Sequence, residues 1–236
     1  MKESFKQTQT DLKQQRFDIE FSGTTAVTVI VSPNGVATCA NIGDSRAIVL
    51  SWKDGKWTNS SLSRDHKPEL YEEFERITRY GGRVEAYKDE YGYDFGPKRI
   101  WLKHENLPGL AMSRSFGDLC ACRAGVIQQP EIIDRKLTEH DKAIVLASDG
   151  VWEFLDNNTV MNILIPHLEA GTSDKGINEV VKQSVANWKN EDVVIDDITI
   201  VLAEINPKDE NYALSANPSK RTLRIKSSYR SIPNFH

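Results

Sequence analysis

The sequence predicts a mixed α/β sandwich whose sheets are largely antiparallel. A β-rich run over residues 24–62 is interrupted only by short turns, two amphipathic segments at 158–170 and 173–190 follow later, and a strand closes the core at 196–205. Strands come first, helices lie between the later strands and a strand comes last, which differs from the βαβ repeat of parallel sheets. The 236 residues suffice for one large domain with a sizeable core or for two small domains.

The first part of the chain is expected to contain a helix, a meander and a second helix. The first twenty residues are polar with a few apolar positions such as Phe5 and Leu12, which indicates the end of an amphipathic helix packed on something larger. "TTAVTVIV", "VATCANI", "SRAIVLS" and a weaker strand around Trp57–Leu62 are separated by the turns "SPNG", Gly43-Asp44 and "KDG". "ELYEEFERITRYGG" then predicts a helix that ends in a left-handed glycine cap.

The second part begins with a segment that reads as a long loop. Residues 85–108 carry clustered Tyr, Asp and Gly, and a loop of this length in a compact domain is more often functional than idle. "LAMS" and "EIIDRKL" are expected to be strands, and "AIVLAS" at 143–148 has the apolar run of a strand buried on both faces. The two amphipathic helices and the closing strand "DDITIVLAEI" complete the order.

The charge distribution separates an acidic body from a basic tail. Lys plus Arg is 30 against 34 Asp plus Glu, a net charge of −4 that does not suggest a nucleic-acid-binding protein. From residue 207 onward there are six basic and two acidic residues with many Ser, Asn and Pro. Such a composition cannot offset the entropy of ordering. We therefore expect one domain over 1–206 and a flexible basic tail over 207–236 that is dispensable for folding.

The sequence also bears on the cellular compartment. No apolar run approaches the roughly 18 to 20 residues of a membrane span, and the start "MKESFKQTQTDLKQQ" lacks the apolar centre of a signal peptide. These features predict a protein of the cytoplasm or nucleus without a membrane span.

Carboxylates stand where apolar strands meet polar turns. Asp149 directly follows "VLAS", and Asp196 directly precedes "ITIVL". Antiparallel neighbours would bring those two strand ends together, and two adjacent carboxylates either share a proton or bind a hard cation such as Mg²⁺ or Mn²⁺. Glu153 would add a third oxygen ligand if residues 149–153 are helical, because it would then share a face with Asp149. Asp65 in "RDHKP" would be a fourth oxygen ligand. For any single Asp, an N-cap or an Asx-turn explains the position equally well.

Other phosphate chemistries are excluded by spacing. A cysteine-nucleophile phosphatase needs C-x5-R, but Ser45, Val126 and Gln128 stand six residues after the three cysteines. No G-x-x-x-x-G-K-[ST] or G-x-G-x-x-G loop occurs, so nucleotide cradling is unsupported. The five histidines are dispersed without metal-ligand spacing.

Seven motifs in order carry a family resemblance. They are "SGTTA" at 22–26, "NIGDSRA" at 41–47, "DHKP" at 65–68, "GGRV" at 81–84, "GLAMSRSFGD" at 109–118, "LASDGVWE" at 146–153 and "DDIT" at 196–199. This series resembles the metal-dependent type 2C (PPM-type) Ser/Thr protein phosphatases and covers roughly residues 21–205. One such match is weak evidence, but the ordered series is highly specific.

The resemblance implies an α/β/β/α sandwich of two mainly antiparallel sheets flanked by helices. It also implies hydrolysis of phosphoserine and phosphothreonine in proteins by a water activated by Mg²⁺ or Mn²⁺, so phosphorylated proteins are the expected partners. Asp149 and Asp196 match the family's core metal aspartates, and Asp65 and Glu153 match an accessory metal position. Glu153 stands where many members have Asp.

The resemblance also marks a substrate side. The segment 85–108 resembles the family's flap, in which Tyr91 and Tyr93, like Tyr87 and Phe95, are candidate peptide contacts, although a loop packed on itself is an equal alternative. Arg114 is expected to form a supporting ion pair with Asp118 rather than a phosphate contact.

The chain departs from the family in one large respect. The family's upstream Arg and its D-G-H-G-G stretch, whose Asp bridges two metals, have no counterpart, and "DGH" occurs nowhere in the sequence. We therefore expect an N-terminally incomplete catalytic domain, either a truncated piece or one that a second chain completes. The 236 residues alone are expected to be catalytically silent. The alternative function is a non-catalytic phosphatase-like module that binds phosphoproteins or regulates a partner.

Overall fold

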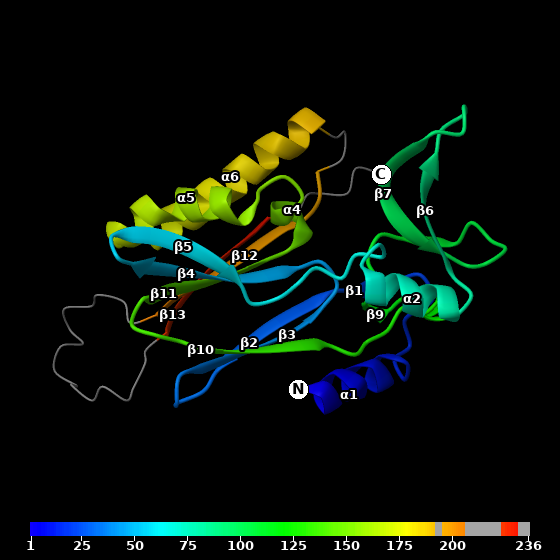
Figure 1. Cartoon of the computed structure of the whole chain (residues 1–236), viewed down its shortest axis with the longest axis horizontal. Coiled ribbons are helices and arrows are strands. Elements are labelled where there is room, and N and C mark those ends of the chain that lie inside the picture. The colour runs from blue at the N-terminus through cyan, green and yellow to red at the C-terminus, as the bar shows by residue number, and fades with distance from the viewer. Residues whose placement is uncertain (192–194, 206–222, 231–236) are drawn as a thin grey trace. The chain divides into compact units, whose positions relative to one another are not determined.

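The computed structural model describes residues 1–191, 195–205 and 223–230 (Figure 1). Contacts divide the chain into two compact units. Unit 1 contains residues 1–28, 40–44 and 64–132, and unit 2 contains residues 29–39, 45–63 and 133 onward. The expected mixture of helices and antiparallel sheets is confirmed. Among the described residues, no helix is long and apolar enough to cross a membrane.

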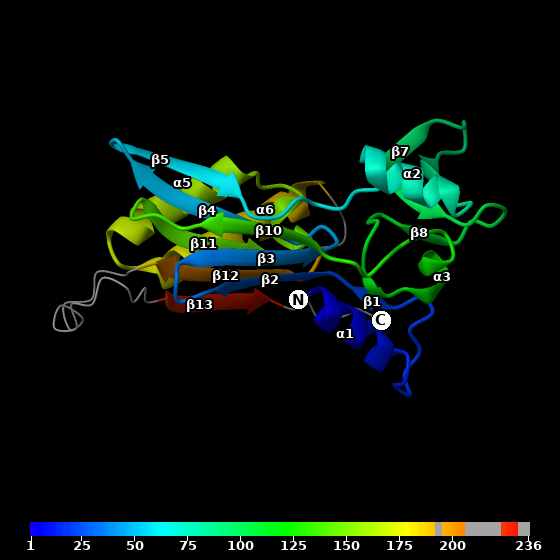
Figure 2. The same ribbon diagram turned by 60° about the horizontal axis from the view of Figure 1, so that its bottom comes forward.

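The main sheet of unit 2 has five strands in the order β13-β12-β11-β4-β5 (Figure 2). The strands are β4 (Arg46–Lys53), β5 (Lys56–Ser61), β11 (Asp141–Ala147), β12 (Ile198–Ile205) and β13 (Leu223–Arg230), and every neighbouring pair is antiparallel. Asp54 and Gly55 close the β4–β5 hairpin with φ of 52° and 75°. Such a two-residue Asp-Gly turn has the twist that neighbouring strands require.

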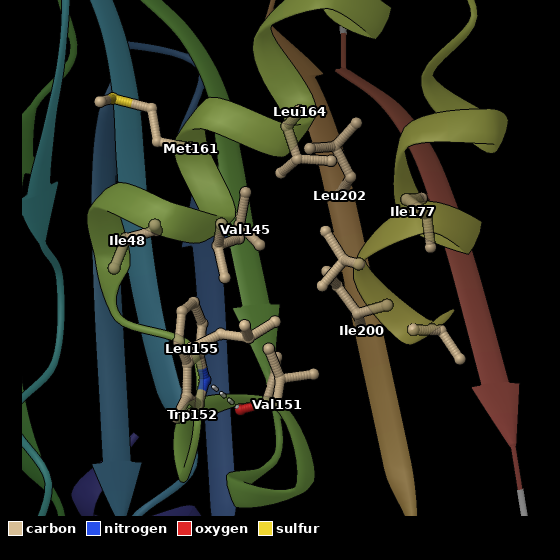
Figure 3. Packing of buried hydrophobic residues seen from close by; sticks show 14 of the residues in the cluster. Ile48, Val145, Val151, Trp152, Leu155, Met161, Leu164, Ile177, Ile200 and Leu202 are labelled. Atoms are coloured by element: carbon tan, nitrogen blue, oxygen red, sulfur yellow. Dashed lines mark hydrogen bonds between the residues drawn. The ribbon is translucent and has the colours of Figure 1, made fainter. Parts of the chain in front are cut away.

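Two helices cover one face of this sheet in unit 2 (Figure 1). They are α5 (Asn157–Glu169) and α6 (Ser173–Glu191), close to the predicted spans. Asp156 caps α5 by accepting the Thr159 N–H at 2.7 Å. Buried apolar side chains from both helices and from β11, β12 and β4 form the core, among them Leu164, Ile177, Val145, Ile200, Leu202 and Ile48 (Figure 3).

A three-stranded sheet has the order β10-β3-β2. Its strands are β2 (Ala26–Val31), β3 (Val36–Ile42) and β10 (Glu131–Lys136). The central strand β3 is mostly buried, whereas the edge strand β2 has no buried residue and leaves Ile30 58% exposed.

The N-terminal helix of unit 1, α1 (Lys2–Leu12), packs through one apolar and one polar side chain. The ring centroids of Phe5 and Phe116 lie 5.3 Å apart, and the buried Gln9 accepts the Gly117 N–H at 2.9 Å through Oε1. Phe116–Gly117 is strand β9, which pairs with β1 (Gly23–Thr24). The sequence prediction of a packed amphipathic helix is confirmed.

Residues 85–108 are not a long loop, which corrects the sequence prediction. Strands β6 (Arg83–Lys88), β7 (Asp94–Trp101) and β8 (Pro108–Leu110) form an antiparallel sheet. The Tyr87 ring stacks on Phe95 and meets the Trp101 ring edge-on, with centroids 5.7 and 5.3 Å apart. Cross-strand aromatic pairs of this kind stabilise the sheet. The Asp and Gly residues of the segment, which are typical of turns, led to the prediction of a loop.

Unit 1 also contains α2 (Tyr71–Arg79) and the short helix α3 (Leu119–Cys122). The predicted left-handed cap of α2 is confirmed, because Gly81 has φ 81°. The predicted strand "LAMS" is wrong: only Leu110 lies in a strand, at the end of β8.

The expectation of a flexible tail is wrong for residues 223–230. These residues form β13 and pair with β12 along its whole length, from Ile198↔Arg230 to Ile205↔Leu223. Lys226 also contacts Asp174 of α6 at 2.6 Å. A partner strand supplies the backbone hydrogen bonds that composition alone did not reveal. The other residues of the predicted tail lie outside the described residues.

Candidate metal site at the ends of β11 and β12

The exit of β11 lies beside the entry to β12 in unit 2. Ala147 pairs with Ile200, the Ser148 N–H donates to Thr199 O at 3.0 Å, and the Thr199 N–H donates to Ser148 Oγ at 3.1 Å. Antiparallel pairing therefore brings together the two strand ends from which Asp149 and Asp196 extend, as the apolar patterns predict.

Asp149 opens the short helix α4 (Asp149–Trp152), with Ser148 in an extended conformation before it. The Glu153 N–H donates to Asp149 O at 2.8 Å, so the two carboxylates leave the chain one helical turn apart. Asp149 is half-buried and Glu153 is exposed. The Trp152 indole donates to Ala147 O at 2.8 Å and holds this turn against the strand end (Figure 3).

Asp196 lies two residues before β12 and is exposed. Its Oδ1 accepts the Asp197 N–H at 2.7 Å. The link to Asp149 is a close backbone approach: a Cβ added to Gly150 would lie 2.3 Å from Asp197 O. Only glycine allows this contact, and each of the two aspartates is the immediate neighbour of one member of it.

The two aspartates offer carboxylate oxygens, the donors that Mg²⁺ and Mn²⁺ prefer. Among the described residues, no three or more His, Cys, Asp or Glu side chains form a group that could hold a metal ion. Asp149 and Asp196 thus fit a hard cation in the kind of ligand they provide, as a pair of carboxylates. The four-ligand set that includes Glu153 and Asp65 stays a prediction.

Asp65 belongs to unit 1 and is half-buried there. Hydrogen bonds hold the backbone on both sides of it. Asn41 Nδ2 donates to Arg64 O at 3.1 Å, and the His66 N–H donates to Gly43 O at 3.0 Å. The His66 imidazole is fully buried, and burial together with the nearby Arg114 charge lowers its pKa to about 4.

Arg114 pairs with Glu73 and not with Asp118, which corrects the expected partner. Its Nη2 lies 2.6 Å from Glu73 Oε1, its Nε also donates to the same carboxylate, and Nη1 donates to Gln129 O at 2.9 Å. Asp118 instead accepts the Ser115 hydroxyl at 2.6 Å. The supporting role expected of Arg114 is favoured over a phosphate contact, because these acceptors already engage its guanidinium.

Tyr91 and Tyr93 lie at the β6–β7 turn of unit 1, with 77% and 73% of their surface exposed. Both backbone N–H groups donate to Asp89 Oδ1, at 2.9 and 2.8 Å. This Asx-type turn fixes the backbone while the two rings face solvent. Their predicted role as peptide contacts stays a prediction, whereas Tyr87 and Phe95 pack on each other.

The sequence did not single out Glu73 or Ser113. Glu73 is fully buried in α2 and accepts the Ser113 hydroxyl and the Arg76 and Arg114 guanidiniums. The available signal was weak: Glu73 and Arg76 have the i, i+3 spacing of a helical ion pair, which is usual for exposed residues.

A family model for protein phosphatase 2C matches residues 1–194. The chain belongs to the protein phosphatase 2C family. This phosphatase 2C chain is 42% identical over 177 residues to probable protein phosphatase 2C 12 of Oryza sativa subsp. japonica, a match that covers 75% of the chain and 43% of the relative. It is 40% identical over 195 residues to probable protein phosphatase 2C 61 of Arabidopsis thaliana, covering 81% of the chain and 57% of the relative.

Solved structures support the fold. The serine-threonine phosphatase 2C from Toxoplasma gondii superposes with a TM-score of 0.72 at 22% identity, covering 85% of this chain and 64% of that one. A C. elegans sex determining protein superposes with a TM-score of 0.65 at 16% identity, covering 85% of this chain and 44% of that one. The chain spans about half the length of the curated relatives it matches.

Proposed function

We propose that this phosphatase 2C chain carries the Asp149 and Asp196 part of a site that hydrolyses phosphoserine and phosphothreonine in proteins with Mg²⁺ or Mn²⁺. The observation that supports the proposal is the close backbone approach of Gly150 to Asp197 O, because Asp149 and Asp196 are the immediate neighbours of these two residues at the ends of β11 and β12. Family membership supports the reaction class.

In the proposed reaction, the residues of this chain bind the metal ion and hold its ligands in position. Asp149 and Asp196 would supply anionic oxygens for a divalent cation. Glu153, one helical turn after Asp149, would supply a further oxygen in unit 2, and Asp65 would supply one from unit 1. A bound Mg²⁺ or Mn²⁺ supplies a water of lowered pKa and neutralises charge on the phosphoryl oxygens. The hydrogen bonds of Trp152 and Ser148 keep the turn that presents Asp149 in one conformation.

The test is Mn²⁺ binding by the 236-residue chain, measured by calorimetry for wild type, Asp149→Asn and Asp196→Asn. Each substitution removes one ligand charge but little volume, so we expect Mn²⁺ affinity to fall at least about tenfold while the fold is kept. Asp156→Asn is the matched control: it removes the same charge in the same unit, and Asn also caps a helix.

Turnover of a phosphothreonine peptide with Mn²⁺ is measured on the same four proteins. Turnover that Asp149→Asn abolishes and Asp156→Asn leaves unchanged would support the full proposal. Mn²⁺ binding without turnover would support the metal ligands and agree with the sequence expectation of a silent chain. Equal Mn²⁺ affinity in all four proteins would refute the assignment of Asp149 and Asp196.

A further inference from the structure

We propose that Glu73 is a positioning residue for Asp65: through Ser113, its buried carboxylate fixes the backbone on which Asp65 is presented. The inference rests on the proposed function in that Asp65 is taken as an accessory metal ligand. All the residues involved lie in unit 1.

The first step is the clamp around Asp65. Gly43 and His66 exchange two hydrogen bonds: the His66 N–H donates to Gly43 O at 3.0 Å, and the Gly43 N–H donates to His66 Nδ1 at 3.1 Å. Asn41 Nδ2 donates to both Arg64 O and Gly43 O, at 3.1 and 3.2 Å. The peptide groups before and after Asp65 are therefore tied to residues 41–43.

The second step joins this clamp to Ser113. The Ser113 N–H donates to His66 O at 2.8 Å, and its hydroxyl lies 3.1 Å from the same oxygen. The hydroxyl has one hydrogen, and the Glu73 carboxylate lies closer to it and is the stronger acceptor. Ser113 therefore stands between the Asp65 segment and Glu73.

The third step is the fixation of Ser113 by the Glu73 cluster. Arg76 Nη2 bonds Glu73 Oε2 at 2.7 Å and Ser113 O at 2.8 Å, while its Nε donates to Gly125 O at 2.8 Å. Arg114 approaches the other carboxylate oxygen at 2.6 Å. Ser113 is thus held through its hydroxyl and its carbonyl by one buried anion and its cations.

The electrostatics keep this anion charged. Burial alone would raise the Glu73 pKa, but hydrogen bonds from Arg76, Arg114 and Ser113 outweigh burial and lower it to about 2. Buried ion pairs of this kind add little net stability compared with apolar residues of the same volume. What their fixed donor geometry does supply is one conformation for Ser113, and through Ser113 for the segment that carries Asp65.

The test uses Glu73→Gln and Ser113→Ala, with Ser115→Ala as the matched control. Ser115 is also fully buried and also donates its hydroxyl to a carboxylate, that of Asp118, so the control removes the same atom and the same kind of bond. If Glu73→Gln fails to fold because two arginines lose their anion, Ser113→Ala decides the question.

Two readouts are measured on the whole chain. Amide hydrogen exchange by NMR should become at least about tenfold faster at Gly43 and His66 in both variants, with core amides such as Ile144 and Val145 unchanged. A role in global stability alone would accelerate the core amides as well. In the Mn²⁺ titration, the weaker binding step that Asp65→Asn removes should weaken at least about tenfold in both variants. The step that depends on Asp149 should keep its affinity.

The outcomes separate the inference from the proposed function. Faster exchange at Gly43 and His66 together with a weakened Asp65-dependent step, both absent in Ser115→Ala, would support positioning by Glu73. Wild-type exchange and an unchanged Asp65-dependent step in folded Ser113→Ala would overturn it, as would the absence of any Asp65-dependent step in wild type. If wild type shows no Mn²⁺ binding step that Asp149→Asn removes, the result counts against the proposed function instead.

Discussion

Three carboxylates of this chain lie in different environments. Asp196 is exposed, Glu73 is buried among two arginines and a serine, and Asp141 is buried at the start of β11. A carboxylate near water can exchange its hydration for a cation, whereas a buried one that is already saturated by donors cannot do so without leaving them unpaired. Burial therefore separates the candidate metal ligands from the structural anions, although all are the same kind of group.

Asp141 carries a stability prediction. It accepts Ser51 Oγ at 2.6 Å, the Thr138 N–H at 2.6 Å and Arg135 Nη2 at 2.8 Å. Burial would raise the pKa of Asp141, but these donors outweigh it and hold the pKa below the ordinary 3.8. Asp141→Asn should lower the free energy of unfolding by about 1–3 kcal/mol at pH 7. The NH₂ group of Asn is a donor, and it would face the donors that now bond the carboxylate, so some of these hydrogen bonds would be lost.

The pH dependence of this effect has a definite sign. A lowered folded-state pKa stabilises the fold above the ordinary pKa, and the stabilisation is lost as pH falls through the folded-state value. The difference between wild type and Asp141→Asn should therefore narrow below about pH 3.8. Urea unfolding at several pH values measures this difference. Asp134→Asn is the control, because Asp134 is exposed and accepts the Thr38 hydroxyl at 2.6 Å. A difference that grows toward acid would contradict the argument.

Secondary structure elements depend on partners that the local sequence does not announce. β13 has a polar, basic sequence, yet it lies along β12 and contacts α6 through Lys226 and Ser228. β7 contains Gly96 and Pro97, yet it pairs with β6 through an aromatic cluster. In both cases a neighbouring strand satisfies the backbone, and the side chains only need to be compatible.

The β13 strand carries the prediction at this scale. A chain ending at residue 205 should be less stable than the full chain, because β12 loses its partner strand and becomes an edge. A chain ending at residue 230 keeps β13 and should match the full chain. Urea unfolding midpoints of the three proteins measure this. Equal midpoints for all three would restore the expectation of a dispensable tail.

At the scale of the whole chain, metal binding should raise the free energy of unfolding, because an ion that binds only the folded state stabilises that state. At a Mn²⁺ concentration of 100 times the dissociation constant, we expect about 2.7 kcal/mol of stabilisation and a rise in melting temperature of roughly 5–10 °C. Tryptophan fluorescence is a suitable probe, since Trp152 and Trp188 bond Ala147 O and Gly150 O beside the candidate site. Asp196→Asn should reduce the rise to about half or less, because a tenfold weaker site is stabilised by only about 1.4 kcal/mol at the same Mn²⁺ concentration. EDTA should reverse the rise, and an equal rise in that variant would place the ion elsewhere.

Much of the candidate site could be predicted from local pattern. The apolar runs before Asp149 and after Asp196 indicated strands whose ends would meet, and β11 and β12 do pair in that way. The spacing of Asp149 and Glu153 indicated a shared helical turn, which α4 provides. These features depend on hydrophobic periodicity and short-range geometry, both of which are written in consecutive residues.

Contacts between residues far apart in the chain were decided only by the tertiary structure. Glu73 is 41 residues from its partner Arg114, so nothing in the sequence distinguished Glu73 from Asp118 as the acceptor. Gly150 became necessary only because Asp197 O lies where its Cβ would be. The sequence by itself determined the fold class, the family and the strand ends that carry the aspartates. The tertiary structure decided which charges are buried and paired, because desolvation and hydrogen-bond geometry depend on what surrounds a side chain in space.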